Sequence, residues 1–349
     1  MSGGVDSSVA AAILSDEGYE VVGVTLNLFG ERDGEELQSR ASASVEGARA
    51  VAEQCSFDHH VLDCGEEFEE FVIEPFCQAY LKGETPNPCV FCNPTIKFGR
   101  LLQEAQKLGA ETVATGHHAQ VRLDEGRERW LLVKGSDPAK DQSYALYRLS
   151  QEHLSRALFP VGGMTKMETR SLARRLDLPT AEKAESQEIC FVPGDNYRAF
   201  LRARYPDAIK PGPIVDRSGR KLGEHTGLPF YTVGQRKGLG IAAREPLYVV
   251  SLDFENNSLV VGQAEDVFSD SCRVRDVNWI AFSSPDQELR ADVKIRYRHE
   301  AAPATVVPQE TGRVLVRFDA PQRAMTPGQS AVFYAGEVVV GGGIIGSQA

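Results

Sequence analysis

The spacing of hydrophobic positions in the first 194 residues alternates between that of strands and that of helices. Short apolar runs rich in Val, Leu and Thr predict strands at 20–26, 59–63 and 112–116. Helical spacing of apolar positions predicts helices at 45–54, 98–108 and 165–178. Thr165 and Glu168 stand at capping-box spacing at the start of the last helix. This alternation is typical of a parallel α/β sheet covered by helices, and the polar stretch 31–44 is predicted to be a mobile loop.

After about residue 196 the pattern changes to short strands separated by Gly- and Pro-rich segments. Strands are predicted at 248–252, 258–261, 290–297, 314–318, 330–334 and 337–345. Their spacing from about residue 270 favours a small antiparallel barrel. We therefore expect three domains, listed by range: an α/β domain at 1–194, a β-rich domain at 195–268 and a barrel at 269–349.

Composition narrows the class of protein. The 349 residues are 42% hydrophobic and 25% charged, as in a soluble globular protein. No apolar run reaches the ~20 residues of a membrane helix, and no signal peptide opens the chain, so we expect a cytoplasmic protein without a membrane partner. The net charge of −11 argues against an unspecific nucleic-acid binder, but it allows a tRNA enzyme with a local basic patch. Seven cysteines in a cytosolic chain are not a disulfide framework.

A glycine-rich segment, the nucleotide loop (residues 2–8), opens the chain. Gly3 and Gly4 lack side chains, so backbone N–H groups can close around phosphate oxygens, and the serines add hydroxyl donors. The apolar run that follows predicts a helix, whose N-terminus favours an anion. Asp6 would repel phosphate, which favours a structural or metal-linked role. The loop resembles that of the ATP pyrophosphatases; the plainer interpretation is a Gly-rich turn before an ordinary helix.

Such loops follow the first strand of a parallel sheet, and here only Met1 precedes the loop. We therefore expect a further strand of ~5–6 residues to belong before Met1. Either the start of the chain is assigned too late, which we favour, or the protein is truncated.

Two cysteine segments carry the remaining chemistry. In the first, Pro86 and Pro88 stiffen the chain before Cys89 and Cys92. The second holds Cys190 within residues 185–192. Taken alone, Cys190 is an ordinary buried thiol, and the Cys-x-x-Cys pair is half a zinc site or a redox pair. No second Cys-x-x-Cys exists, which argues against a zinc site with four cysteine ligands.

Together with the nucleotide loop, these segments resemble the tRNA-specific 2-thiouridylases, which make 2-thiouridine at the wobble position (U34). The resemblance covers essentially the whole chain. Further matching stretches are 114–119, 140–144, 159–162, 232–238, 294–298 and 327–331. It implies an N-terminal parallel α/β domain of the PP-loop (adenine nucleotide hydrolase-like) type, which binds ATP and carries the catalytic residues, a small β-rich linking domain and a C-terminal antiparallel β-barrel that contacts tRNA.

The resemblance also implies roles for individual residues. ATP would be held by Met1, Ser2, Gly3, Gly4, Val5, Asp6, Ser7, Leu26 and Gly116. Cys92 matches the nucleophile, and Cys190 matches the cysteine that carries a persulfide. The target base and tRNA would be contacted by Asn87, Pro88, Cys89, His117, Lys140, Asp141, Gln142, Arg296, Tyr297 and Gln329. No metal ligand is implied, and Mg²⁺ is inferred only from ATP chemistry.

The implied reaction is a sulfurtransferase reaction. Adenylation turns the C2 oxygen of uridine into a leaving group, and the persulfide on Cys190 supplies sulfur. Cys92 then attacks the sulfur bridge and leaves a Cys92–Cys190 disulfide that must be reduced. In an alternative route, Cys92 releases hydrosulfide from the persulfide, and hydrosulfide attacks the base.

One residue departs from the family pattern. Many members carry Asp where this chain has Cys89, and that Asp is a candidate acid–base group, so its role is in doubt here. Three cysteines, Cys89, Cys92 and Cys190, could instead bind a 4Fe–4S cluster with one open iron. The route through bare thiols is preferred.

Partners are implied in the same way. The tRNAs for Gln, Glu and Lys are the expected substrates, and a cysteine desulfurase or a sulfur-relay protein is the expected donor. Arg290, Lys294, Arg296 and Arg298 are predicted to alternate along one strand and form a basic face. Arg236 and Lys237 would extend that face, and Tyr297 would stack on a base.

Three other functions compete with this one. A ligase that amidates a small acid would share the loop, although no glutaminase-like Cys/His/Glu arrangement is present. A sulfur carrier or iron–sulfur protein without catalysis would not need an ATP loop. An RNA-binding module with a relic loop would bind tRNA without consuming ATP.

Overall fold

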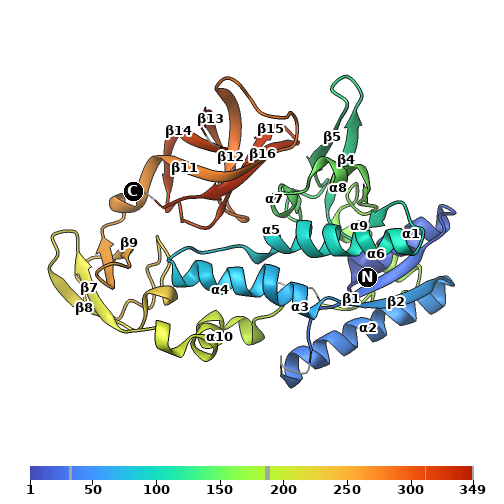
Figure 1. Ribbon diagram of the computed structural model, residues 1–349, viewed down its shortest axis with the longest axis horizontal. Helices are drawn as coiled ribbons and strands as arrows, with labels where there is room; N and C mark the ends of the chain where they lie inside the picture. Colours follow the sequence, from blue (N-terminus) through green and yellow to red (C-terminus); the bar gives the residue numbers. More distant parts are fainter. Residues whose placement is uncertain (31–33, 185–188, 311, 348–349) are drawn as a thin grey trace.

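A computed structural model describes residues 1–30, 34–184, 189–310 and 312–347. An α/β region, a middle region and a barrel follow one another along the chain, and α4 and α5 lie between the sheet strands and the barrel (Figure 1). None of the described helices is long and apolar enough to cross a membrane.

The N-terminal region contains parallel strands, as predicted, but in two separate pairs. β1 (Val22–Asn27) pairs with β2 (Asp58–Asp63), and β3 (Val113–Ala114) pairs with β6 (Ala157–Leu158). The helices around them are α1 (Val5–Asp16), α2 (Glu35–Cys55), α3 (Gly65–Phe68), η2 (Glu69–Ile73), α4 (Glu74–Leu81), α5 (Pro88–Cys92), η3 (Asn93–Arg100), α6 (Leu101–Lys107), α7 (Ser143–Leu146), α8 (Gln151–Ser155) and α9 (Lys166–Arg175). The predicted α/β class is confirmed.

The predicted loop at 31–44 is wrong where the structure describes it, because α2 begins at Glu35. Glu35 and Glu36 in the first turn favour a helix N-terminus. Of residues 35–44, only Leu37 is buried, so the apolar spacing that marks a helix is absent there. Residues 31–33 lie outside the described part of the chain.

The helix predicted at 98–108 begins earlier than expected. α5 continues into the π-helical segment η3 and then into α6, so the helical stretch runs from Pro88 to Lys107. Gly99 fits this wide turn because a Cβ there would lie 2.8 Å from the carbonyl oxygen of Pro94. The capping box at Thr165 and Glu168 is present at the start of α9, as predicted.

The middle region is a four-stranded sheet with short helices. Its strand order is β8–β7–β10–β9, and only the β7–β10 pair is parallel. The elements are α10 (Tyr197–Arg204), β7 (Gly212–Asp216), β8 (Lys221–His225), β9 (Tyr248–Asp253) and β10 (Ser258–Gly262), with one-turn helices η4 (Pro193–Asp195), η5 (Pro206–Ala208), η6 (Leu228–Phe230) and η7 (Glu265–Val267). Phe76 and Phe191 of the N-terminal region share a core with Leu259 of this sheet.

The C-terminal region is a closed antiparallel barrel, as predicted. Its strands are β11 (Phe268–Trp279), β12 (Leu289–Lys294), β13 (Ala302–Gln309), β14 (Arg313–Arg323), β15 (Ser330–Ala335) and β16 (Val338–Ile345). β11 pairs with both β14 and β16, which closes the ring. The hairpin β4 (Ala119–Asp124) and β5 (Arg129–Lys134) adds to the edge of β16, so the N-terminal region is joined to the barrel sheet.

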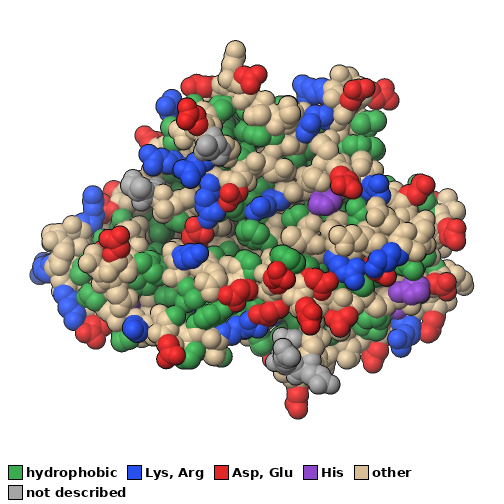
Figure 2. Space-filling view, in the orientation of Figure 1, with side chains coloured by type: hydrophobic (Ala, Val, Ile, Leu, Met, Phe, Trp, Pro, Cys, Tyr) green, Lys and Arg blue, Asp and Glu red, His purple; other side chains and the backbone are tan. Residues whose placement is uncertain are grey.

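The predicted basic face at 290–298 is wrong beyond Lys294, where β12 ends. Arg296 and Arg298 lie in the following turn, and Arg290 pairs with Asp319. Figure 2 shows acidic side chains gathered over α3 and the start of α4, whereas Lys and Arg side chains lie over the lower part of the barrel.

Candidate active site

The nucleotide loop leads directly into α1, with Gly4 at the N-cap. Gly3 has a φ of +62°, and a Cβ there would lie 2.4 Å from the carbonyl oxygen of Ser44 on α2. The backbone therefore needs glycine at this position. The hydroxyls of Ser2 and Ser7 lie 3.1 Å apart, and no side chain among the described residues caps α1. The free N–H groups at this helix start can bind phosphate oxygens.

Asp6 is held by two basic side chains rather than directed at a ligand. Lys166 Nζ donates to both carboxylate oxygens at 2.6 and 2.8 Å, and His118 Nε2 lies 3.3 Å from Oδ1. Burial acts to raise the pKa of Asp6, but the hydrogen bonds from His118 and Lys166 and their charges outweigh it and lower the pKa. The carboxylate thus fixes α9 against the first turn of α1.

The chain after β3 passes closely over the first turn of α1. A Cβ on Gly116 would lie 2.5 Å from the carbonyl carbon of Asp6 and from the amide nitrogen of Ser7. Leu26, at the carboxyl end of β1, is half-buried. The Met1 amino group bonds to the carbonyl of Val24, and burial followed by the charge of Lys97 lowers its pKa to about 5. The carboxyl end of β3 therefore meets the first turn of α1, as in α/β folds that bind ligands at strand ends, whereas Leu26 packs against the core that contains Cys92 and Phe191.

The cysteine loop (residues 84–92) ends in α5. Asn87 caps this helix by accepting from the Cys89 amide at 3.1 Å, and Pro88 occupies its first position. Cys89 is exposed and Cys92 is buried, and their three-residue spacing places them on one face. Burial raises the pKa of Cys92 to about 11, while Lys97 acts in the opposite direction.

Cys190 is anchored by the same core as Cys92. Its neighbour Phe191 packs edge-on against Phe68 and Phe76, with ring centroids 5.7 and 5.0 Å apart. Cys190 is exposed, yet the surrounding protein atoms raise the pKa of its thiol to about 12, and Cys92 and then Cys89 add to this effect. The three thiols therefore lie within electrostatic reach of one another. Residues 185–188 of this motif lie outside the described part of the chain.

Lys97 is a site residue that the motifs did not indicate. It lies on η3, and its charge acts on the Met1 amino group, His117, Cys92 and Cys190. Lys97 lies five positions after Cys92, and the π-helical turn brings the two residues to the same side. A helix-period pattern could not reveal this relation.

Several residues expected to contact tRNA make contacts within the protein in this structure. His117 is buried between Phe98 and Phe159 and bonds to Thr115 Oγ1 at 2.7 Å. Its pKa is held well below the usual range, first by burial and then by Lys97.

The segment 140–142 likewise has internal partners. Asp141 accepts from the amides of Gly135 and Ser143, both at 3.0 Å, and Gln142 accepts from the His118 amide at 2.9 Å. Lys140 is half-buried beside them.

The barrel brings its predicted residues to the cysteine loop. Tyr297 lies within electrostatic reach of Cys89 and Asp141, and Lys294 Nζ lies 5.7 Å from its ring centroid. Burial is the main cause that raises the pKa of Tyr297. Arg296 donates to the carbonyl of Arg323 at 2.6 Å, and its buried Nε has no partner among the described residues.

Gln329 connects the barrel to the cysteine loop. Its amide nitrogen donates to Thr85 O at 2.7 Å, and the Thr85 amide donates to Pro327 O at 2.7 Å. Arg275 bonds to both carboxylate oxygens of Glu84 at 2.6 and 2.8 Å. These bonds fix the start of the loop that carries the cysteines.

Metal binding is not favoured by this arrangement. Within the described ranges, no group of three or more His, Cys, Asp or Glu side chains is placed to hold a metal ion. Cys89, Cys92 and Cys190 therefore do not form a ready set of ligands for a single metal ion among the described residues. All seven cysteines are free thiols.

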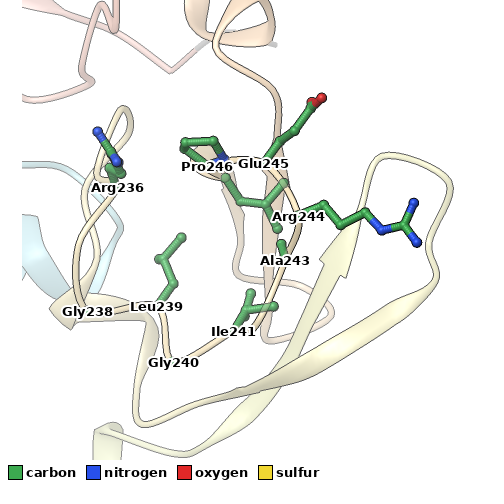
Figure 3. Close-up of a pocket in the computed structure, with 10 residues that line it drawn as sticks. Arg236, Gly238, Leu239, Gly240, Ile241, Ala243, Arg244, Glu245 and Pro246 are labelled. Carbon is green, nitrogen blue, oxygen red and sulfur yellow. The ribbon is translucent and has the colours of Figure 1, made fainter.

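Two surface pockets lie apart from the cysteines. One, of about 530 Å³, lies between the end of β1 and α2, lined among others by Asn27, Phe29 and Gln38. The other, of about 390 Å³, is formed by the loop before β9; Figure 3 shows Arg244 extending away from it and Arg236 at the other end of the loop. Neither pocket is lined by a cysteine or by the nucleotide loop.

Known families match the chain in three consecutive parts. The family described as "tRNA methyl transferase HUP domain" matches residues 1–194, "tRNA methyl transferase PRC-barrel domain" matches 198–263, and "Aminomethyltransferase beta-barrel domain" matches 269–345.

Relatives match over nearly the full length. The tRNA-specific 2-thiouridylase MnmA of Moorella thermoacetica is 50% identical, covering 100% of this chain and 99% of its own. That of Heliobacterium modesticaldum is 50% identical over 99% of this chain and 91% of its own. The tRNA-specific 2-thiouridylase MnmA 1 of Caldanaerobacter subterraneus subsp. tengcongensis is 48% identical, and the match covers 99% of this chain and 96% of that protein.

Proposed function

The chain belongs to the tRNA-specific 2-thiouridylase family, and we propose that it converts the wobble uridine (U34) of tRNA to 2-thiouridine. ATP would activate the C2 oxygen, and a cysteine persulfide would supply the sulfur. The products would be thiolated tRNA, AMP and pyrophosphate.

One observation carries this proposal: the nucleotide loop and the cysteines converge on one place. Gly116 passes closely over the nucleotide loop, and the charge of Lys97 acts on the adjacent His117 as well as on Cys92 and Cys190. An enzyme that first adenylates a base and then transfers sulfur to it needs both groups within reach of the same carbon atom.

In the first step, the C2 oxygen attacks the α-phosphorus of ATP and pyrophosphate leaves. The residues assigned to ATP are Met1, Ser2, Gly3, Gly4, Val5, Asp6, Ser7, Leu26 and Gly116. The N–H groups at the start of α1 would donate hydrogen bonds to phosphate oxygens. Asp6 would hold the loop in shape through Lys166, and Mg²⁺ would enter with the nucleotide.

In the second step, the terminal sulfur of the Cys190 persulfide attacks C2, and AMP leaves with the original oxygen. The Cys92 thiolate then attacks Cys190 Sγ, which releases the thiocarbonyl base and forms a Cys92–Cys190 disulfide; a reductant must restore the two thiols. The raised pKa values of about 11 and 12 leave both free thiols protonated at neutral pH. A persulfide ionises more readily than a thiol, which supports it as the attacking group.

Two routes of sulfur transfer are alternatives to direct attack by the persulfide. Hydrosulfide released by Cys92 could attack the base, or a 4Fe–4S cluster on Cys89, Cys92 and Cys190 could carry it. Iron and sulfide analysis after anaerobic purification separates them, because an iron-free, colourless and active enzyme excludes the cluster.

The RNA would lie across the cysteine loop and the barrel. Exposed Tyr297 beside Cys89 suits stacking on the target base, and the basic side chains of the barrel suit the phosphate backbone. We assign base and tRNA contacts to Asn87, Pro88, Cys89, His117, Lys140, Asp141, Gln142, Arg296, Tyr297 and Gln329. Those with internal bonds in this structure would exchange them on RNA binding.

The proposed partners follow from the reaction. Substrates would be the tRNAs for Gln, Glu and Lys, and sulfur would come from a cysteine desulfurase or a relay protein in the cytoplasm. We place the domain limits at residues 194 and 268.

The test is a thiolation assay on the 349-residue chain. It contains ATP, Mg²⁺, a desulfurase with cysteine, and unmodified wobble-uridine tRNA, and 2-thiouridine is detected by mass spectrometry after digestion. We expect product only with ATP, lost in Cys92→Ser and in Cys190→Ser but retained in the matched control Cys55→Ser. AMP formation without a thiolated base would favour a small-acid ligase, and tRNA binding without ATP consumption would favour an RNA-binding module.

A further inference from the structure

Lys97 is placed by an unusual helical turn. η3 spans Asn93–Arg100 and is π-helical, so residues five apart lie one turn above each other. In an α-helix the corresponding spacing is three or four residues. Cys92, directly before η3, and Lys97 are five residues apart, and the wide turn therefore places both on the same side.

The sequence of this segment maintains the wide turn. Pro94 has no N–H to continue an α-helical ladder, and Gly99 leaves room for the Pro94 carbonyl, which would lie 2.8 Å from a Cβ. π-helical turns are rare and are frequently found at functional sites. A wide turn here changes the position of Lys97 relative to Cys92.

Lys97 is half-buried among groups that do not neutralise it. Its charge acts on the Met1 amino group, on His117, and on the thiols of Cys92 and Cys190. Two of these groups are basic and two are protonated thiols. Among the described residues, the structure gives Lys97 no hydrogen bond or ion pair, whereas Lys166, the other lysine near the loop, is bound to Asp6.

A half-buried ammonium group without a counter-ion among the described residues provides a binding position for an anion. The anions of the proposed reaction are the phosphate of the nucleotide and the sulfur that attacks C2, and both must reach this place. Fixed positive charge beside a developing negative charge stabilises a transition state.

Building on the proposed function, we propose that Lys97 is a catalytic residue whose ammonium group contacts the α-phosphate of the adenylated uridine beside Cys92. It would stabilise the extra negative charge as pyrophosphate departs, and again as AMP leaves with the C2 oxygen. It would also favour the thiolate form of Cys92 for the last step.

The experiment compares Lys97→Met, Lys97→Arg and the control Lys107→Met, an exposed lysine on α6 that pairs with Glu104. Single-turnover pyrophosphate release is measured with saturating ATP and tRNA. We expect about a 100-fold slower release for Lys97→Met, the size found when one charge-stabilising donor is removed. Lys97→Arg should recover most of the rate, and Lys107→Met should match the wild type.

A second readout separates catalysis from folding. The rate of Cys92 alkylation is followed against pH by peptide mass spectrometry, and its midpoint should move upward in Lys97→Met but not in Lys107→Met. Pyrophosphate release by Lys97→Met at the wild-type rate would overturn the assignment of Lys97 while wild-type thiolation stands. Failure of the wild type to thiolate tRNA would instead overturn the proposed function, and the role of Lys97 with it.

Discussion

Replacing Gly116 with Ala is expected to weaken ATP binding with little effect on the rest of the fold. A Cβ at this position would lie 2.5 Å from two backbone atoms of the nucleotide loop, the carbonyl carbon of Asp6 and the amide nitrogen of Ser7. Ordinary van der Waals contact begins at 3.4 Å, so the loop must move by about 0.9 Å. Because the obstacle is backbone, no rotation of a side chain can relieve it.

The size of the effect follows from the cost of overpacking. An added methyl group that forces a backbone shift costs about 1–3 kcal/mol. If the loop must return to its original position to bind phosphate, this cost is subtracted from the binding free energy. With about 1.4 kcal/mol for each tenfold change, ATP affinity should fall by about 5- to 150-fold.

The assay is calorimetric titration of ATP into the wild type, Gly116→Ala and Gly163→Ala. Gly163 is the matched control, since a Cβ there would meet nothing within 4 Å. Gly163→Ala should bind like the wild type, and circular dichroism should show that both variants are folded. Equal ATP affinity for Gly116→Ala and Gly163→Ala would refute the assignment of this close approach to the nucleotide site.

Three further predictions concern neighbouring contacts. Lys166→Met removes two bonds to Asp6 and should lower the free energy of unfolding by about 1.5–3 kcal/mol in urea titrations. The pKa of Asp6 is lower in the folded state than its unfolded value of 3.8, so the difference in unfolding free energy between the wild type and Lys166→Met is complete above pH 3.8 and should shrink as the pH falls below it. A difference that stays constant down to pH 3 would contradict the pairing. Burial raises the pKa of Cys92 to about 11 from an ordinary 9.0, so alkylation of Cys92 at pH 7 should be about 100-fold slower than alkylation of a free thiol. A pH profile of the alkylation rate with its midpoint near 9 would contradict this prediction. Gln329→Leu removes the bond to Thr85 and should lower the kcat of thiolation about 5- to 10-fold without changing ATP affinity, whereas the control Gln322→Leu, whose amide bonds within the barrel, should not.

Much of the fold could be predicted because most elements bury one face. The barrel strands β12 and β13 alternate buried and more exposed residues, and the predicted ends of β1 and β2 lie within two residues of the observed ends. The start of α2 could not be predicted, because its first turns are exposed apart from Leu37. The end of β12 at Lys294 was also missed, since the alternation continues into a turn that the sequence pattern does not distinguish from a strand.

The residues of the candidate site also fall into two groups, those that the sequence indicates and those that it does not. The nucleotide loop and the cysteines stand in contiguous motifs, so their chemistry could be inferred from the sequence alone. Lys166 could not be connected with Asp6, which lies 160 residues away along the chain. Lys97 was missed for a different reason: its relation to Cys92 depends on a π-helical turn, and helix-period analysis assigns it to another face.

Adenylation of the uridine C2 oxygen is the central claim, and isotope transfer tests it most directly. Wobble-uridine tRNA is prepared with ¹⁸O at C2 of U34 and incubated with ATP, Mg²⁺ and the sulfur-donor system, and the released AMP is examined by mass spectrometry. The proposed mechanism predicts ¹⁸O in the phosphate of AMP in an amount equal to the 2-thiouridine formed. Thiolated tRNA accompanied by unlabelled AMP would contradict it, because the oxygen would then have left by a route that does not pass through an adenylated base.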